Sequence, residues 1–431
     1  MVFGSCLSRC IVNDMATELE IELDESGRNL PAKHELHSTP ANGTTSTTFG
    51  TTSLLAADEV MCLNMIGEGP SGVIYKGSYR GSPVAVKQMK MISMPTHPSA
   101  REAIESALEI EASRMGSLRH PNTVLFMGAC LQGDYFCIVS EYCSHGSLYN
   151  VLHNPNVDTS PSRNKRAASK DSMPPRVNGT SGNTMHSFHT TDSKKKKSTL
   201  KWSLRIRLAL GAARGLLYLH SAEPPLVHGQ LKSTNILVDD SWNAKLADFG
   251  TRRVAEAVGF DRRRLEKVDS DTGLLRWTAP ELLKLGEERV FKGKLPSGHV
   301  SPQAVDVYSF GIVLWELTTG ELPFADCKSN HEIRDRLLQG LRPPMTPGNY
   351  NIKWADLIVR CWSDDPLRRP TAAEIVSTLE IINKEESLVQ AEKRKARVVN
   401  SNRADYRFAD RKHSKARNAS KFRTNVRVPE L

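Results

Sequence analysis

The chain has 431 residues, 39% hydrophobic and 25% charged, with a formal net charge of +10 at pH 7, values that fit a folded protein working in water. No apolar run reaches the roughly 18–20 residues that cross a bilayer, and the first residues lack the pattern of a secretory signal, so we expect no transmembrane segment. The eight cysteines have no CxxC pair and no regular spacing, so neither a disulfide framework nor a zinc site is implied, and we expect a reducing, cytoplasmic setting.

Taken in chain order, the first half alternates between patterned and unpatterned segments. Residues 1–57 are rich in Thr, Ser, Gly and Asn without a sustained hydrophobic period, which predicts a disordered segment. Short apolar runs at 60–66, 72–79 and 83–89, separated by glycine-rich turns, predict antiparallel strands. Residues 101–118 repeat apolar side chains at steps of three and four, which predicts a helix.

A basic, Ser-rich segment, 154–200, interrupts the globular pattern and predicts a disordered surface insertion. The runs 204–220, 305–320 and 370–388 then predict helices, the first two with wide apolar faces. The fold class is therefore α+β, with a small sheet-bearing part before a larger helical part and a cleft between them. We place this folded domain at 58–383 and a basic C-terminal tail at 384–431.

The positive charge of the chain is concentrated in that tail. Residues 393–427 contain 13 Lys or Arg and 2 Asp, a net of +11, so the rest of the chain is close to neutral. Such a segment is attracted to phosphates, and an anionic membrane is one partner that it fits. A solvated tail without a dedicated partner is the alternative. Its three aromatic residues are too few to favour stacking on bases, so nucleic acid is not expected.

A phosphate site is indicated near the start of the sheet. Gly67, Gly69 and Gly72 have the spacing G-x-G-x-x-G between two predicted strands, where glycines let backbone N–H groups approach phosphates. A strand follows instead of a helix, which disfavours a dinucleotide site. Lys87 lies among apolar neighbours and needs a partner if buried. Glu111, the carboxylate on the apolar stripe of the next helix, is the expected one.

Nine motifs in order resemble the protein-kinase fold over about residues 60–383, and within it the tyrosine-kinase-like (Raf-like) group. They are GEGPSGVIY, VAVK, Glu111, SEYCSHGSL, HGQLKSTN, DFG, APE, DVYSFG and CWSDDPLRRP. The resemblance implies a bilobal fold, with a small antiparallel-sheet N-lobe and a larger helical C-lobe, that binds ATP and Mg²⁺.

The resemblance also implies residue roles. The glycine loop would cover the phosphates, Lys87 would contact them, and Glu111 would orient Lys87. Asn235 and Asp248, both hard oxygen ligands, would hold Mg²⁺. Glu281 should pair with Arg369, and Asp306 should anchor the catalytic loop. Ser140 would be a small gatekeeper, the backbone of Glu141 and Cys143 would bond adenine, and the other implied nucleotide contacts are Ile66, Ile74, Ala85 and Leu237.

Three residues depart from the family pattern. Gln230 stands where kinases have the Asp that accepts the substrate proton, and an amide cannot accept it. Gly229 replaces an Arg that clamps an activation-loop phosphate in related kinases. Leu274 stands where a Thr usually supports the catalytic Asp and Lys. Lys232 is retained and could still touch a phosphate.

The loss of the base predicts a pseudokinase that binds Mg-ATP and acts as a scaffold or allosteric partner of another signalling enzyme. HGxLKSxN and LLxWTAPELL also resemble the kinase-homology domains of membrane guanylate cyclases, which are regulatory. A weakly active or unconventional serine/threonine kinase is the alternative. A third hypothesis is a membrane or nucleic-acid adaptor that works through its tail, with a vestigial cleft. Lipid on Cys6 and Cys10 would cooperate with the tail at a membrane; Val2 excludes myristoylation.

Overall fold

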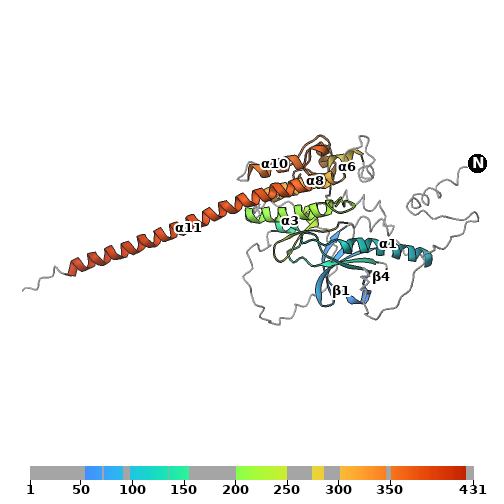
Figure 1. Cartoon of the computed structure of the whole chain (residues 1–431), viewed down its shortest axis with the longest axis horizontal. Coiled ribbons are helices and arrows are strands. Elements are labelled where there is room, and N and C mark those ends of the chain that lie inside the picture. The colour runs from blue at the N-terminus through green and yellow to red at the C-terminus, as the bar shows by residue number, and fades with distance from the viewer. Residues whose placement is uncertain are drawn as a thin grey trace, which may run out of the picture. The chain divides into compact units, whose positions relative to one another are not determined.

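The computed structural model describes residues 54–69, 72–90, 98–133, 135–154, 200–249, 274–285, 301–345 and 351–423 (Figure 1). The predictions for residues 1–53 and for the insertion at 155–199 lie outside these ranges. All described residues belong to one compact unit that begins at Thr52.

The N-terminal part is a five-stranded antiparallel sheet, as the alternating apolar runs predict. Its spatial order is β1-β2-β3-β5-β4, with a short 3-10 turn, η1, before it. The helix α1 (Pro98–Ser117) contacts β4 (Figure 1). The bounds are η1 Ala57–Glu59, β1 Val60–Gly69, β2 Gly72–Tyr79, β3 Ser82–Lys90, β4 Phe126–Gln132 and β5 Tyr135–Glu141.

The two faces of this sheet bury different clusters because neighbouring residues of a strand point to opposite sides. Val84 and Val86 of β3 join a cluster on one face. Met89 joins a second cluster, on the other face, which includes Ala112 and Met115 of α1. Lys87 lies two residues before Met89, so its charged side chain is on the face of the sheet that packs against α1.

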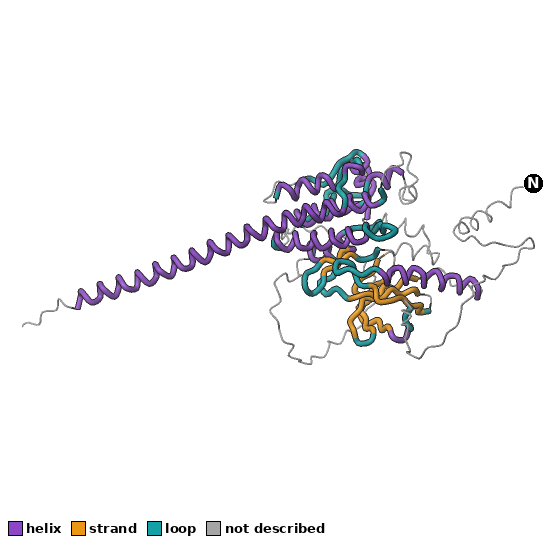
Figure 2. The backbone as a smooth tube through the Cα atoms, in the orientation of Figure 1, coloured by secondary structure: helices purple, strands orange, loops and turns teal. Residues whose placement is uncertain are grey.

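The C-terminal part is mostly helical (Figure 2) and contains a two-stranded hairpin of β6 and β7, which follows α3 in the chain. Its core is one contiguous cluster in which α8 is buried along most of its length. The bounds are α2 Leu148–His153, α3 Trp202–His220, η2 Ser233–Asn235, β6 Ile236–Val238, β7 Ala244–Leu246, η3 Leu274–Trp277, α6 Pro280–Leu285, α8 Gln303–Thr319, α9 Asn330–Leu338, α10 Ile352–Cys361, η4 Pro366–Arg368 and α11 Ala372–Arg423.

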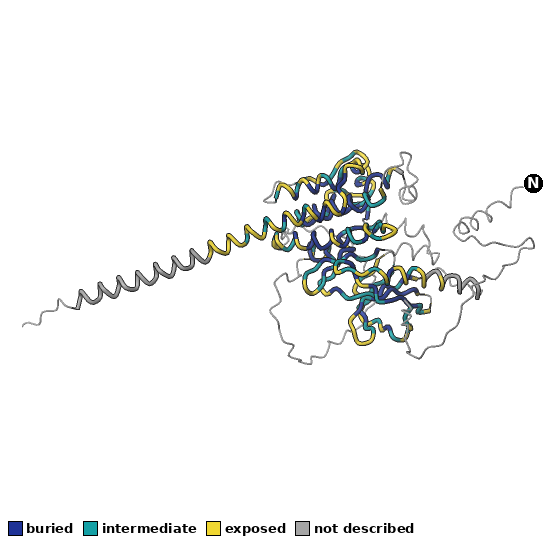
Figure 3. Tube along the Cα trace, viewed as in Figure 1, coloured by how far each residue is buried: buried dark blue, intermediate teal, exposed yellow. Residues whose placement is uncertain are grey.

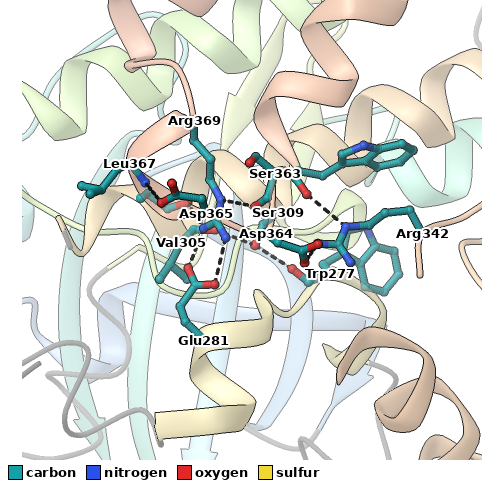
Figure 4. A network of polar contacts seen from close by, with 12 residues as sticks. Trp277, Glu281, Val305, Ser309, Arg342, Ser363, Asp364, Asp365, Leu367 and Arg369 are labelled. Carbon is teal, nitrogen blue, oxygen red and sulfur yellow. Dashed lines mark hydrogen bonds and ion pairs between the residues drawn. The ribbon is translucent and has the colours of Figure 1, made fainter. Parts of the chain in front are cut away.

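A buried ion pair joins α6 to the segment before α11, as the sequence predicts. Arg369 Nη2 donates to Glu281 Oε2 at 2.8 Å, and a second guanidinium nitrogen bonds the other carboxylate oxygen (Figure 4). The same guanidinium lies over the ring of Tyr308 in α8, 5.1 Å from its centroid. Because every donor of the pair has an acceptor nearby, the charges are tolerated in the core.

Helix α11 continues beyond the boundary that we placed at 383/384. Ile375, Leu379 and Ile382 are buried against the C-terminal part, whereas residues 391–397 are exposed on every side (Figure 3). Among the described residues, no helix is both long and apolar enough to span a membrane.

Candidate nucleotide-binding cleft

The glycine-rich turn joins β1 to β2, and Gly69 and Gly72 are the last cross-strand partners before it. Gly72 has φ +139°, and a Cβ there would lie 2.0 Å from the Gln88 carbonyl oxygen, so only glycine fits. At Gly67 the nearest atom to such a Cβ is 3.8 Å away, and at Gly69 there is none within 4 Å. The fold therefore needs Gly72, whereas a Cβ at Gly67 would make only an ordinary contact and a Cβ at Gly69 would meet open space.

The sheet register brings several predicted nucleotide contacts to one face. Ala85 is directly opposite Ser140 of β5, and Lys87 is opposite Ile74 of β2. Directly opposed residues share a face, and so do residues two apart in a strand. Ile74, Ala85, Lys87 and Ser140 therefore form one surface. Ile66 lies at a register shift in β1 and is exposed.

Lys87 and Asp248 form the ion pair at the centre of the cleft. Lys87 Nζ is 2.9 Å from Asp248 Oδ1, although the two residues are far apart in sequence. Burial opposes ionisation of Asp248, but the charge and hydrogen bond of Lys87 outweigh it and hold the pKa of this carboxyl below its ordinary value. Asp248 also has φ +63°, a strained conformation for a non-glycine residue.

The predicted pairing of Lys87 with Glu111 is wrong in this structure. Glu111 Oε1 accepts a hydrogen bond from Arg114, one turn along α1, at 2.8 Å. The nearer arginine satisfies the carboxylate, and Asp248 satisfies the lysine. The helical stripe placed Glu111 on the correct side of α1, but it could not show that the lysine has a closer acidic partner.

Asp306 of α8 anchors the catalytic loop, as predicted. Its two carboxylate oxygens accept the backbone N–H groups of His228 and Gly229, each at 2.8 Å. His220 Nε2 lies 2.9 Å from the same carboxylate. The shape of the loop therefore depends on Asp306 and the backbone, and not on the side chain of Gln230.

Asn235 and Asp248 lie on adjoining segments. Asn235 Nδ2 donates to the Gln230 carbonyl oxygen at 2.9 Å, and the Ala247 N–H donates to the Asn235 carbonyl oxygen at 2.8 Å. An amide and a carboxylate oxygen fit Mg²⁺, which completes its shell with water and phosphate. Within the described ranges, no group of three or more His, Cys, Asp or Glu could hold a metal ion. Lys232, the residue before η2, is partly buried.

The segment that links the lobes follows β5. Glu141 Oε1 accepts from Lys245 Nζ of β7 at 2.8 Å and from the Leu125 N–H at 2.7 Å. Leu237 is opposite Lys245 in the hairpin and shares its face. Burial raises the pKa of the Cys143 thiol to about 12, so it stays protonated and unreactive. Because Leu237 shares a hairpin face with Lys245, and Lys245 bonds Glu141, Leu237 lies on the face that turns toward this linker.

Comparison with known proteins decides the family. The family model described as protein tyrosine and serine/threonine kinase matches residues 60–379. The chain belongs to the protein kinase family. Its five-stranded sheet and helical second lobe are the bilobal α+β kinase fold that the sequence predicts.

The kinase domain is similar to several proteins named as kinases. A Dictyostelium discoideum protein named probable serine/threonine-protein kinase drkD is 34% identical over 315 residues, 73% of this chain and 19% of that protein. The Arabidopsis thaliana serine/threonine/tyrosine-protein kinase HT1 is 33% identical over 318 residues, 74% of this chain and 65% of HT1. The matched region thus spans less than two thirds of each relative.

All three departures in this kinase domain lie within the described residues, and the Gly229 N–H bonds Asp306. Gln230 is partly buried at the catalytic position. Leu274 is buried at the start of η3, where its backbone carbonyl oxygen accepts a hydrogen bond from the Thr278 hydroxyl at 3.1 Å. A buried leucine makes no hydrogen bond to the catalytic loop, so both polar side chains that usually assist proton transfer are replaced.

Two features near the site were not predicted from the sequence, namely the Glu141–Lys245 pair between the lobes and the buried Glu316 of α8. Glu316 accepts hydrogen bonds from Trp277 Nε1 at 2.7 Å and Ser233 Oγ at 3.0 Å. A signal existed for Lys245, because it alternates with the apolar Ala244 and Leu246. No local pattern predicts Glu316, which is surrounded by apolar residues in the sequence.

Proposed function

We propose that this kinase domain binds Mg-ATP in the cleft and regulates another signalling enzyme as a pseudokinase, either as a scaffold or allosterically. The observation that carries the proposal is the Lys87–Asp248 pair beside Asn235, next to a catalytic loop in which Gln230 replaces the base. Groups that bind nucleotide remain, and the group that takes the proton does not.

The residues fit the cosubstrate that the family uses. Lys87 offers a positive charge to the phosphates, Asn235 and Asp248 offer hard oxygens to Mg²⁺, and Glu141 and Cys143 offer backbone groups to adenine. Mg-ATP would supply a phosphoryl group polarised by the metal. The chain would bind and orient it, with Gly67 and Gly69 leaving room for the phosphates.

The missing carboxylate sets the expected size of the defect. Loss of general-base help lowers a rate by about 10²–10⁴-fold, which corresponds to roughly 3–5 kcal/mol of barrier. Phosphoryl transfer depends mostly on positioning and electrostatics, so the loss need not be complete.

Nucleotide binding is tested by thermal shift on the purified full chain. We expect millimolar Mg-ATP to raise the melting temperature and expect Lys87→Met to abolish the rise. Lys90→Met changes an exposed lysine of the same strand and should keep it. No shift in the unaltered chain would contradict the binding half of the proposal.

The catalytic half is tested with radiolabelled ATP and a general protein substrate. We expect the unaltered chain to incorporate little phosphate and Gln230→Asp to incorporate more, by up to about 10²–10⁴-fold. A rate in the unaltered chain within the ordinary kinase range of about 1–100 per second would refute pseudokinase status.

A weakly active or unconventional serine/threonine kinase is the second candidate, because Lys87, Asn235 and Asp248 are all present and the matched relatives are named as kinases. This candidate predicts slow phosphate incorporation by the unaltered chain that disappears in Asp248→Ala. Activity that survives that substitution would point to a contaminating enzyme.

We further propose a cytoplasmic protein that associates with partner proteins and, through its basic tail, with anionic membranes. The net charge of +11 over 393–427 supports the membrane partner. Lipid on Cys6 and Cys10 would strengthen the attachment, because a single weak anchor holds only reversibly.

A further inference from the structure

A polar cavity of about 630 Å³ lies outside the nucleotide cleft, between α3, the start of β7 and α11. Its walls also include the loop that leads from α1 to β4. The polar side chains that line it are Asn122, Ser203, Arg207, Arg214, Asn243 and Asn383.

One face of α3 forms the longest wall. Ser203, Arg207, Gly211 and Arg214 follow one another at steps of four, four and three, so they share a helix face. A Cβ at Gly211 would lie 2.9 Å from Asn122 Nδ2, so the helix packs closely against the loop there. The two arginines flank this contact, with Cα atoms about 10 Å apart along the axis.

The positive charge of the cavity is only partly compensated. Arg207 Nη2 donates to the Ser241 carbonyl oxygen at 2.8 Å and to Asn243 Oδ1 at 2.9 Å, both neutral acceptors. No carboxylate in the described part of the chain pairs with it. Arg214 pairs with Glu380 at 2.9 Å, and both side chains are about half exposed. The lining contains no Asp or Glu, so the cavity favours an anion.

The rest of the lining is apolar and comes from Pro121, Leu204, Leu210, Gly211 and Ala244. A cavity of this size exceeds what a single inorganic anion fills. In an extended polyproline II segment, which has three residues per turn and rises about 3.1 Å per residue, carboxylates three residues apart lie on one side and about 9 Å apart, close to the spacing of the two arginines. An apolar residue between them would cover Leu204 and Leu210.

We propose that this cavity docks a short, extended acidic segment of a partner protein, with carboxylates at Arg207 and Arg214 and an apolar side chain on the floor. The hairpin separates the site from the nucleotide, because Ala244 lines the cavity while Lys245 turns to Glu141 on the other side. A docked partner would therefore leave the cleft open, and the proposal stands whether or not nucleotide binds.

The test uses the full chain and a fluorescein-labelled hexapeptide, Glu-Leu-Glu-Glu-Leu-Glu, followed by fluorescence polarisation. We expect saturable binding and a weakening of about tenfold or more in Arg207→Glu, since hydrogen bonds to charged groups are among the strong ones. Arg334→Glu makes the same charge change on the exposed surface of α9 and should bind as the unaltered chain does. No binding up to about 1 mM peptide would overturn the proposal.

A second variant guards against misfolding of Arg207→Glu, whose arginine holds the β6–β7 turn. Ser203→Glu adds a repelling charge at the cavity and leaves the Arg207 side chain itself in place. A glutamate in the first turn of α3 is also favourable for the helix. Its matched control is Ser113→Glu on exposed α1. We expect weaker binding only in Ser203→Glu, and equal weakening in both variants would overturn the site.

Cross-linking separates the cavity from the basic tail. Benzoylphenylalanine replaces one leucine of the hexapeptide, and mass spectrometry locates the adduct. Adducts at Leu204, Leu210 or Asn383 support the proposal. Adducts confined to residues 393–431, or displacement of the peptide by an equal concentration of inorganic phosphate, would overturn it.

Discussion

Gly72 and Gly69 differ in what a side chain would meet, although both flank the same turn. A Cβ at Gly72 would lie 2.0 Å from the Gln88 carbonyl oxygen, on a backbone with φ +139°. We expect Gly72→Ala to lower the free energy of unfolding by about 1–3 kcal/mol from backbone strain, with the clash adding to it. Urea denaturation monitored by circular dichroism measures the change.

Gly69→Ala is the control, because nothing lies within 4 Å of a Cβ placed there. This substitution should change stability by less than about 0.5 kcal/mol. Equal losses in the two variants would mean that the turn has a different backbone path.

At the residue scale, the sequence predicted which residues form the candidate site better than it predicted which of them pair with one another. The kinase motifs identified Lys87 and Asp248 as parts of one site, and the structure joins them at 2.9 Å. Glu111 was assigned to Lys87 because both lie on buried faces, yet Arg114 bonds it. Periodicity reports which side of an element a residue occupies. It does not report which of two nearby charges is closer.

At the element scale, the buried pair of Glu281 and Arg369 ties α6 to the segment before α11. We expect Arg369→Met to lower the free energy of unfolding by about 3–5 kcal/mol, since it leaves Glu281 charged and unpaired in the core. Arg336→Met should cost far less, because Arg336 pairs with Asp326 and Glu332 near the surface, where solvent screens the pair. Chemical denaturation of both variants distinguishes them, and equal losses would contradict the argument.

Besides Asp306, helix α8 carries a second buried acid, Glu316, whose ionisation opposes folding. Burial raises the pKa of Glu316 despite its hydrogen bonds to His153, Trp277 and Ser233. The unfolded pKa is about 4.3, so the native state holds the proton more tightly. Stability from this group is therefore full below about pH 4.3 and is lost as the pH rises through the raised native value.

Glu316→Gln cannot ionise and should not show that loss. We expect the stability of Glu316→Gln relative to the unaltered chain to improve between pH 5 and pH 8, with a slope of up to about 1.4 kcal/mol per pH unit. Urea denaturation across this range provides the measurement. Parallel pH profiles for the two proteins would show that the native pKa of Glu316 is not raised.

The hydrophobic periodicity of the sequence predicted whether a segment is a strand or a helix, but it did not predict where the last helix ends. The strands at β1–β3 and the helices α1, α3 and α8 match runs with clear spacing. The prediction for the last helix covered 370–388, but α11 extends to Arg423. Residues 391–397 of the helix are exposed, so no buried apolar stripe marks its continuation in the sequence. The cavity beside α3 was also unpredictable, because its lining comes from four separate segments.

At the scale of the whole molecule, charge is separated between a near-neutral body and a basic C-terminal segment. We expect the full chain to bind phosphatidylserine vesicles, since each Lys or Arg near the surface contributes about 1 kcal/mol. Deleting 393–431 should abolish sedimentation with the vesicles while the body still melts cooperatively, because residues 393–397 are exposed. Binding that is unaffected by salt between about 50 and 300 mM would exclude an electrostatic attachment.

Lys87 and Asp248 neutralise each other's charge in the cleft. One charge comes from the sheet and the other from the helical lobe, so each already has the partner that a ligand must replace. Under the proposed function, entry of a nucleotide would be an exchange, in which a phosphate replaces Asp248 as the partner of the Lys87 ammonium and a divalent cation replaces Lys87 as the partner of the Asp248 carboxylate. A nucleotide without its cation would complete only half of the exchange and would bring negative charge beside Asp248. We therefore expect the cleft to select the metal complex over the bare nucleotide.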